Sequence, residues 1–264
     1  MTFRHISEVM RIYYLFVLFL AVLPTPGRAA WILESSTSLS TRSPAVRHEL
    51  KTVADGRAVK LHLVKFDRRQ LTLRVIDLRP EMSVAAAVQS QGGLAGVNGG
   101  YFKPDGSPLG LVISGGMKIH ALEHSKILSG VLVVTAHGAS LLRTAEFRQS
   151  SRMANRKEAL QAGPFLVDHG IAVAGLNATR AAERTVLLAD KQGVAALLIS
   201  QPVTLAEMAR ILVTPGIFPE LTIDRALNLD GGSSTALWVD AQPEAFSHPE
   251  WKPVRNAVAL VPKR

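Results

Sequence analysis

Short segments in which apolar and polar residues alternate, joined by glycine-containing turns, constrain the fold of this 264-residue chain more than any other feature. Apolar residues occupy alternate positions from Val59 to Leu63, and the segment from Leu71 to Val75 repeats the pattern. A period of two is typical of strands with one buried face. Turns at residues 115–116, 137–138 and 191–193 separate further pairs of apolar segments. The sequence therefore predicts many hairpins.

Few segments have the period of a helix. Thr204 and Glu207 have the spacing of a capping box, and apolar residues between Leu205 and Leu212 then fall on one helical face. A second, shorter helix is predicted over residues 83–89. Because the chain has no internal repeat and no strong boundary, we expect one α+β domain with mixed or antiparallel sheets and a few helices.

The first 29 residues have the composition of a secretory signal peptide. Arg4 and Arg11 precede an apolar run from Ile12 to Leu23, which is followed by helix breakers and small residues. This run of 12 residues is shorter than the roughly 20 that a membrane-spanning helix needs, although an uncleaved anchor is the alternative. We expect cleavage before Ala30, no stable membrane span afterwards, and a periplasmic or secreted protein.

Residues 30–47 are rich in serine and threonine and have no apolar period. Such a composition predicts a linker or an irregular lead-in. The ordered domain is then expected to occupy residues 48–264.

The composition excludes several kinds of site. The chain has no cysteine, which rules out disulfides, zinc–thiolate centres and thiol nucleophiles. Its formal charge is +9 at pH 7, but the lysines and arginines are scattered and not clustered. In an exported protein such a surface suits phosphorylated or anionic carbohydrate, so we expect that partner and no nucleic acid.

Two glycine-rich turns contain residues suited to chemistry. The first turn comprises Asn98, Gly99, Gly100, Tyr101 and Phe102 and follows an apolar segment. Adjacent glycines free the backbone and let a ligand approach closely, and asparagine offers both a donor and an acceptor. The alternative is a plain turn that ends a strand, because Asn-Gly is a common hairpin sequence.

In the second turn, Asp230 stands at the end of an apolar segment and is followed by Gly231, Gly232, Ser233 and Ser234. The N–H and hydroxyl donors of such a turn can form a nest for an oxyanion or phosphate. An aspartate beside it can act as a nucleophile, a base or a metal ligand. The alternative is an Asx-turn in which Asp230 caps its own loop.

His120, Glu123 and His124 match the H-x-x-E-H pattern of inverted zinc peptidases. That chemistry needs both histidines on one face of a helix. Glycines shortly before and after the motif, with strand-like segments beyond them, leave little room for one. We therefore expect an exposed connection here, and the sequence predicts neither a metal site nor a cofactor.

Taken together and in order, the two turns and two further segments resemble the phosphodiester glycosidase family. The further segments begin at Gln161 and at Glu183, each at the edge of an apolar strand. Matching segments also lie at residues 109–113 and 204–212, and Arg255 precedes the last strand. The resemblance spans residues 51–261 and depends on the order and spacing of the motifs.

The resemblance implies hydrolysis of a sugar-1-phosphodiester in the cell envelope. A phosphomonoester leaving group has a second pKa of about 6, so it departs without the strong general acid of an ordinary glycosidase. Asp230 is accordingly assigned as nucleophile or base, and Arg184 as the phosphate clamp. The alternative is a non-catalytic envelope protein that binds exopolysaccharide or cell-wall glycan in the same cleft.

The other predicted site residues are assigned to substrate binding. Asn98 and Gln161 are expected to bond to sugar or phosphate, and the turn from Gly231 to Ser234 is expected to cradle an oxyanion. The remaining members of the substrate-binding set are Gly99, Gly100, Tyr101 and Arg255. Glu123 and Glu183 are candidates for a second carboxylate.

Overall fold

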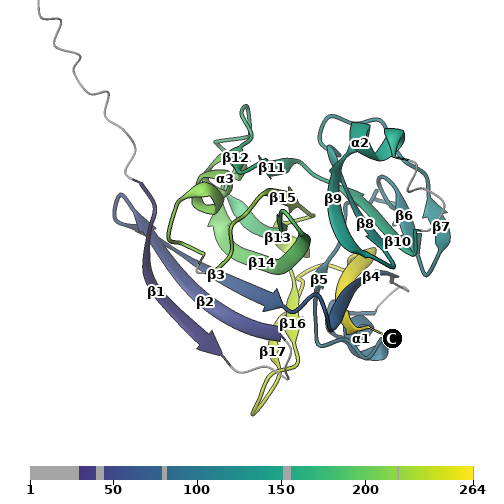
Figure 1. Cartoon of the computed structure of the whole chain (residues 1–264), viewed down its shortest axis with the longest axis horizontal. Coiled ribbons are helices and arrows are strands. Elements are labelled where there is room, and N and C mark those ends of the chain that lie inside the picture. The colour runs from purple at the N-terminus through teal and green to yellow at the C-terminus, as the bar shows by residue number, and fades with distance from the viewer. Residues whose placement is uncertain (1–29, 40–44, 79–81, 151–155, 219, 264) are drawn as a thin grey trace, which may run out of the picture.

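The computed structural model describes residues 30–39, 45–78, 82–150, 156–218 and 220–263. Strands dominate this part of the chain, and three short α-helices accompany them (Figure 1). None of the described helices is long and apolar enough to span a membrane. The predicted signal peptide lies outside the described residues.

The largest sheet has eight strands, and every neighbouring pair in it is antiparallel. In spatial order they are β1 (Ile32–Leu39), β2 (Ala45–Ala54), β3 (Arg57–Phe66), β14 (Gly193–Val203), β13 (Ala182–Asp190), β15 (Arg225–Asn228), β11 (Phe165–Asp168) and β12 (Ile171–Ala172). The β13–β14 hairpin turns at residues 191–192, as the sequence predicts.

Two five-stranded antiparallel sheets complete the fold. The second sheet has the order β7 (Met117–His120), β6 (Val112–Ser114), β10 (Glu158–Ala162), β8 (Gly130–Thr135) and β9 (Gly138–Arg143). The third has the order β17 (Phe246–His248), β16 (Leu237–Val239), β5 (Ala95–Asn98), β18 (Asn256–Pro262) and β4 (Leu71–Asp77). The predicted turns at residues 115–116 and 137–138 join β6 to β7 and β8 to β9.

The helices are α1 (Val84–Ser90), α2 (Thr144–Gln149) and α3 (Leu205–Val213). Helix α3 begins where the capping box predicts: Thr204 Oγ1 accepts from the Glu207 N–H at 3.1 Å, and Glu207 Oε2 accepts from the Thr204 N–H at 2.8 Å. Ser83 caps α1, so the second predicted helix is also confirmed.

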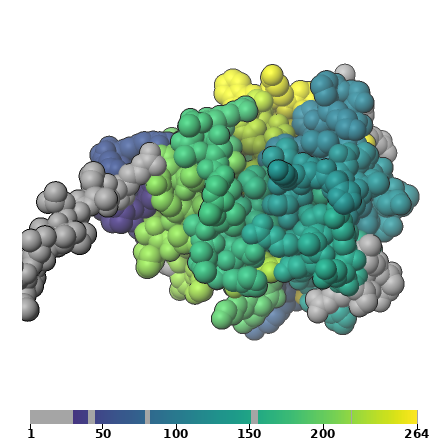
Figure 2. All heavy atoms as spheres, turned by 90° about the horizontal axis from the view of Figure 1, so that it is seen from above, coloured from purple at the N-terminus to yellow at the C-terminus, as the bar shows by residue number. Residues whose placement is uncertain are grey.

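One apolar core is shared by the three sheets. Leu187, Leu132 and Val97, one from each sheet, are fully buried in it. Helix α3 covers the other face of the eight-stranded sheet, and α1 covers the other face of the third sheet. Figure 2 shows the green segments of the first sheet directly against the teal segments of the second. Strand ends from different sheets consequently meet at the middle of the molecule.

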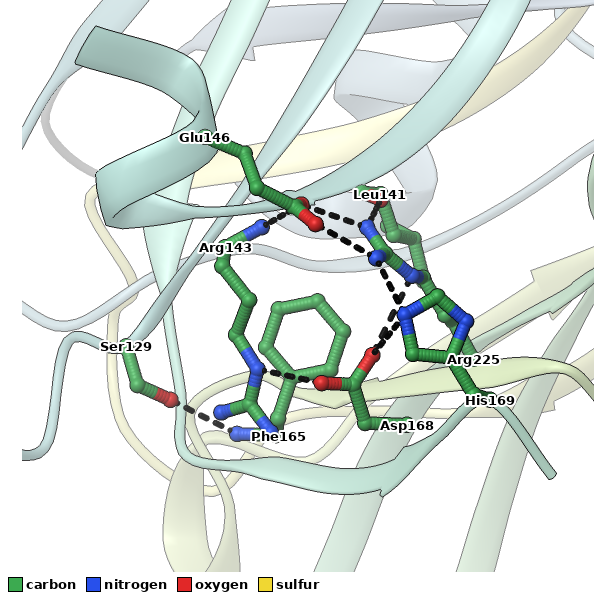
Figure 3. A network of polar contacts seen from close by, with 8 residues as sticks. All are labelled: Ser129, Leu141, Arg143, Glu146, Phe165, Asp168, His169 and Arg225. Carbon is green, nitrogen blue, oxygen red and sulfur yellow. Dashed lines mark hydrogen bonds and ion pairs between the residues drawn. The ribbon is translucent and has the colours of Figure 1, made fainter. Parts of the chain in front are cut away.

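A network of arginines and carboxylates ties the first sheet to the second (Figure 3). Arg225 of β15 donates to both carboxylate oxygens of Glu146 in α2, at 2.6 and 2.7 Å. Arg143 of β9 donates to Asp168 of β11 at 2.8 Å. The Arg143 guanidinium lies 4.4 Å from the centre of the Phe165 ring, a cation–π contact over a buried aromatic.

Two predictions about the fold are corrected. Residues 32–39 form strand β1, not an irregular lead-in, and β2 already begins at Ala45. Strand β1 is an edge strand whose side chains are mostly exposed, so its sequence shows no apolar period although serine and threonine suit a strand. The α+β class is compatible with the structure, but sheet predominates and all pairings between the described strands are antiparallel, so none of the sheets is mixed.

Candidate active site

The two glycine-rich turns lie against each other. Asn98 ends β5, and its side-chain amide donates to the Asp230 carbonyl at 2.8 Å. The Asp230 N–H donates to the Gly99 carbonyl at 3.0 Å. Asn98 Oδ1 accepts from the Thr185 hydroxyl at 2.7 Å and from the Ala236 N–H at 3.1 Å. One side chain therefore joins β5, β13 and both ends of the second turn.

Asn98 is consequently a scaffold residue in this structure, and its expected bond to sugar or phosphate stays a prediction. Its side chain is fully buried, and both acceptor positions of Oδ1 are occupied by protein donors. The sequence placed a donor and acceptor at this turn, but it could not show that the protein itself uses them.

Asn256, at the start of β18, fixes the first turn and was missed by the sequence reasoning. Its Oδ1 accepts from the Gly100 N–H at 2.6 Å, and its carbonyl accepts from the Gly99 N–H at 2.8 Å. A side chain at Gly99 would collide with the Asn256 amide, so this position requires glycine. The available signal was a single asparagine at the start of an apolar strand.

Tyr101 and Asn228 form a second polar contact between the turns. Asn228 ends β15, and its Nδ2 donates to the Tyr101 hydroxyl at 3.0 Å and to the Gly163 carbonyl at 3.1 Å. The Tyr101 hydroxyl donates to the same carbonyl at 2.6 Å. Asn228 Oδ1 is buried and has no hydrogen-bond partner in the described part of the chain. Asn228 lies two residues before Asp230, and the sequence pattern predicts no role for it.

Asp230 lies where the two turns meet. Its Oδ1 accepts from the Gly231 N–H at 2.9 Å, and the Ser234 hydroxyl also bonds to the carboxylate. Burial raises the pKa of Asp230 above its ordinary value, and these two hydrogen bonds oppose the rise without cancelling it. Among the residues that the structure describes, no basic side chain pairs with Asp230.

Arg184 lies on β13, beside the second turn. Its Nε donates to the Val203 carbonyl at 2.9 Å, and its Nη2 donates to the Arg180 carbonyl at 2.7 Å. The side chain is nine-tenths buried, and this burial lowers the pKa of Arg184. Within the described ranges no carboxylate pairs with it: neighbouring Glu183 lies 3.3 Å from His248.

The charges of Asp230 and Arg184 both affect the pKa of Tyr101. Burial and the negative charge of Asp230 raise the pKa of Tyr101 to about 12. The hydrogen bond from Asn228 and the positive charge of Arg184 oppose this rise. At neutral pH the Tyr101 hydroxyl is therefore a neutral hydrogen-bond donor beside two opposite charges.

The predicted oxyanion cradle is a single 3₁₀ turn, η2 (Gly232–Ser234). Gly232 has a φ of +61°, in the left-handed region that favours glycine. Ser234 is buried beside Asp230, whereas Ser233 is exposed. The Ser233 carbonyl accepts from the N–H groups of Trp251 and Lys252, at 2.9 and 3.2 Å. The turn is therefore held in place from both sides.

Gln161 is also a scaffold residue in this structure, and its expected bond to sugar or phosphate likewise stays a prediction. Its Oε1 accepts from the N–H groups of Leu111 and Glu123, both at 3.0 Å. Its Nε2 donates to the carbonyls of Glu123 and Leu128, at 2.9 and 3.1 Å. These four hydrogen bonds use all donor and acceptor positions of the Gln161 amide, and they fix the connection between β7 and β8.

Among the described residues, no hydrogen bond or ion pair joins Arg255 to Asp230 or Arg184. Arg255 pairs with Asp77 at 2.5 Å and donates to the Leu78 carbonyl at 2.8 Å. It lines a cleft of about 790 Å³ that also involves Phe102 and His120. None of Asp230, Tyr101 or Arg184 lines this cleft, so the structure divides the predicted substrate-binding residues between two places.

The H-x-x-E-H segment forms an extended connection after β7, as the sequence predicts. His120 Nδ1 lies 3.0 Å from the Gly110 carbonyl, and His124 Nδ1 lies 3.1 Å from Arg148. Glu123 faces His120 and Lys103, at 3.8 Å from each. The described residues contain no group of three His, Cys, Asp or Glu side chains arranged to hold a metal ion.

Comparison with protein families places this chain in one of them. The model of the phosphodiester glycosidase family matches residues 91–261, and this chain belongs to that family. The match covers both turns, Arg184 and Gln161. It confirms the resemblance seen in the sequence. No curated protein matches the sequence.

Solved structures of low sequence identity share the fold. The catalytic domain of zebrafish N-acetylglucosamine-1-phosphodiester alpha-N-acetylglucosaminidase, auto-inhibited by its pro-peptide, has a TM-score of 0.62 and 16% identity, with 88% of this chain and 89% of that chain covered. A hypothetical protein from Synechocystis has a TM-score of 0.57 and 16% identity, with 89% and 68% covered. A Burkholderia pseudomallei protein described as a candidate exported protein has a TM-score of 0.53 and 13% identity, with 82% and 77% covered.

Proposed function

We propose that this protein hydrolyses a sugar-1-phosphodiester. Water adds to the anomeric carbon, the bond from that carbon to the phosphate oxygen breaks, and a free sugar and a phosphomonoester result. Asp230 acts as base or nucleophile, and Arg184 binds the phosphate. Membership of the phosphodiester glycosidase family supports the reaction class, and the name of the zebrafish relative supports the class of substrate.

The observation that carries this proposal is a half-buried aspartate and a buried arginine, neither of which forms an ion pair with a described protein group. Asp230 has no basic partner and Arg184 has no acidic partner in the described part of the chain. Burial of an unpaired charge is costly, and it persists mainly where the charge acts on a ligand. A phosphodiester anion would compensate Arg184 and bring the bond to be broken towards Asp230.

The orientation of Arg184 suits this task. Two backbone carbonyls hold Nε and Nη2 and thereby fix the plane of the guanidinium. Nη1 makes no hydrogen bond within the described residues and is left for a phosphate oxygen. Because the group is already oriented, little side-chain entropy is lost when the phosphate binds.

The leaving group reduces what the site must supply. A phosphomonoester has a second pKa of about 6 and departs without a strong general acid. One carboxylate is then sufficient, and its raised pKa makes Asp230 a better proton acceptor from water than an exposed aspartate. The Gly231 N–H and the Ser234 hydroxyl hold this carboxylate in position.

We also propose that the protein acts outside the cytoplasm, in the cell envelope. The signal-peptide composition of the first 29 residues supports this location. The structural likeness to a protein described as a candidate exported protein agrees with it.

A panel of glycosyl-1-phosphodiesters, with sugar and aglycone varied independently, tests the proposed reaction. We expect multiple turnovers that release free sugar and phosphomonoester in equal amounts, and loss of this turnover in Asp230→Asn. Tight binding of an anionic glycan without cleavage of any panel member would contradict hydrolysis. That result would favour the alternative, a non-catalytic glycan-binding protein of the envelope.

A further inference from the structure

One tryptophan is exposed beside the Asp230 site. The chain has three tryptophans; Trp31 and Trp238 are 6% and 7% exposed, whereas Trp251 is 82% exposed. Tryptophan has a large apolar surface and is highly buried on average in folded proteins. An indole left almost entirely in water next to the turn that holds Asp230 is therefore a candidate contact for a ligand.

The backbone that carries this ring is fixed to the second turn. The Trp251 N–H donates to the Ser233 carbonyl at 2.9 Å, and the next N–H, of Lys252, donates to the same oxygen. Just before them, Glu250 accepts from the Val84 N–H at 2.9 Å. Trp251 thus stands one hydrogen bond from the turn that holds Asp230, on a segment anchored at both sides.

The same segment continues into the wall of the cleft of about 790 Å³. Pro253 and Arg255 line it together with Phe102, Pro108 and His120. The arginine is held by Asp77, so this wall has a fixed charge distribution. Residues 251–255 therefore connect the Asp230 turn to a space large enough for part of a glycan.

We propose that Trp251 is an aromatic platform on which a sugar ring of the substrate stacks, and that the adjoining cleft receives the part of the substrate beyond that ring. The identity of the substrate rests on the proposed function. A pyranose has an apolar C–H face and a rim of hydroxyls, so its face suits the indole and its rim suits the polar groups of the cleft. The phosphate would lie towards Arg184.

The surroundings of Trp251 favour a sugar over a protein partner. A stable protein interface buries about 800 Å² on each partner and has an apolar centre. The other exposed large apolar side chains of the described residues lie on β1, β2, β7, β12 and the connection before β8, not on residues 249–255. A single ring beside a lysine matches the area of one sugar ring.

Fluorescence tests this platform directly, because Trp251 is the exposed tryptophan and the other two are buried. The probe is the methyl phosphodiester of N-acetylglucosamine 1-phosphate, added to the Asp230→Asn protein so that no turnover occurs. We expect the probe to protect the emission from quenching by acrylamide. Trp251→Ala should bind the probe about tenfold more weakly by calorimetry, whereas Trp251→Phe should retain most of the affinity. Ile32→Ala, which removes another exposed apolar side chain on the outer strand β1, should bind normally.

Kinetics separate this inference from the proposed function. If the wild-type protein hydrolyses the probe and Trp251→Ala has an unchanged KM, the platform is wrong and the function stands. If no phosphodiester is hydrolysed but the probe still protects Trp251, the function is wrong and the platform stands. Absence of protection, or a Trp251-dependent dimer or binding to anionic lipid vesicles without sugar binding, would overturn the platform.

Discussion

At the residue scale, the amide side chains and the charged side chains of the site have different roles. Asn98 and Asn256 use their side chains on the backbone of the two turns, so they fix the shape of the site. Asp230 and Arg184 remain without ion-pair partners among the described residues, so they are the groups that a substrate would complete. The charges of Asp230 and Arg184 shift the pKa of Tyr101 in opposite directions.

Asp230→Asn should lower kcat by at least about a hundredfold, because it removes the charge while keeping the size of the side chain. Burial raises the pKa of Asp230, so the charged form is disfavoured in the folded protein, and this penalty applies at pH values above that raised pKa. The variant should therefore unfold at the same temperature as the wild type or a higher one at pH 7. Steady-state kinetics and calorimetry measure the two effects.

The pH profile gives a second readout of Asp230. If its carboxylate is the base, kcat/KM rises with pH as the proton leaves, and this rise lies above the range of an exposed aspartate. Asp55→Asn, in the exposed β2–β3 turn, is the matched control and should leave the profile unchanged. An active Asp230→Asn, or one that is inactive only because it unfolds, would contradict the catalytic role.

Arg184→Lys should reduce kcat/KM for phosphodiesters by about tenfold or more. The planar guanidinium donates to the Val203 and Arg180 carbonyls and still has a donor for a phosphate oxygen. The single nitrogen of a lysine ammonium cannot reach all three acceptors. Inhibition by the phosphomonoester product should weaken more than inhibition by the neutral sugar product. Inhibition constants for the two products measure this difference.

Arg210→Lys, on helix α3, serves as the control for Arg184. A purely structural Arg184 would give a lysine variant with lower thermal stability and normal kcat/KM per folded molecule. A structural role of Arg184 would depend on its hydrogen bonds to backbone carbonyls. The two nearby carboxylates have other partners, since Glu183 pairs with His248 and Asp190 pairs with Arg68.

At the element scale, strand β17 is attached to the first sheet through a half-buried histidine, His62. The rings of His62 in β3 and Phe246 in β17 lie 4.8 Å apart, and the Arg47 guanidinium lies 4.0 Å from the centre of the Phe246 ring. Arg47 Nη1 is 3.1 Å from His62 Nδ1. Because arginine only donates, Nδ1 accepts and the neutral ring carries its proton on Nε2.

Acid should loosen this attachment. Burial, helped by the charges of Arg47, Lys60 and His248 and opposed by Glu49, lowers the pKa of His62 to about 4. The unfolded chain, with an ordinary histidine pKa of about 6.5, therefore binds the proton first. The free energy of unfolding should fall as pH decreases from about 6.5 to about 4, by about 2 kcal/mol after allowance for solvent screening.

Urea denaturation as a function of pH measures this loss. His62→Gln should flatten the curve across the same range, whereas His137→Gln, in an exposed turn, should leave it unchanged. An identical pH dependence in His62→Gln and the wild type would show that other groups cause the acid sensitivity. Because β17 also carries His248 beside Glu183, loosening should disturb the neighbourhood of the second turn.

At the scale of the whole molecule, Arg225 links the first and second sheets (Figure 3). Its side chain is 12% exposed and pairs with Glu146 and Asp168. Arg225→Ala would leave both carboxylates without this partner, which should cost about 1–3 kcal/mol of unfolding free energy, since both carboxylates are partly exposed and keep bonds from Arg143. Arg69→Ala breaks a pair whose arginine is 89% exposed, so it should cost much less unfolding free energy. Equal losses in the two variants, measured by urea denaturation, would contradict a special role for Arg225.

The sequence by itself determined the local elements and the family. Alternation and glycine turns identified the hairpins, the Thr204–Glu207 box identified α3, and the order of the motifs identified the phosphodiester glycosidase family. These features act over a few residues or depend on fixed spacing along the chain, so they can be read without a structure. Strand β1 was not predicted from the sequence, because its side chains are exposed and its pairing depends on β2.

Only the tertiary structure decided what each polar side chain of the site does. Asn98 bonds to Thr185, Ala236 and Asp230, and Gln161 bonds to the distant connection between β7 and β8, so both amides are filled by protein groups. Asp230 and Arg184 differ from them because folding half-buries the first and buries the second without supplying a counter-charge from the described residues. A hydrogen bond between segments far apart in sequence leaves no local pattern, since its partners come together only when the three sheets pack around one core.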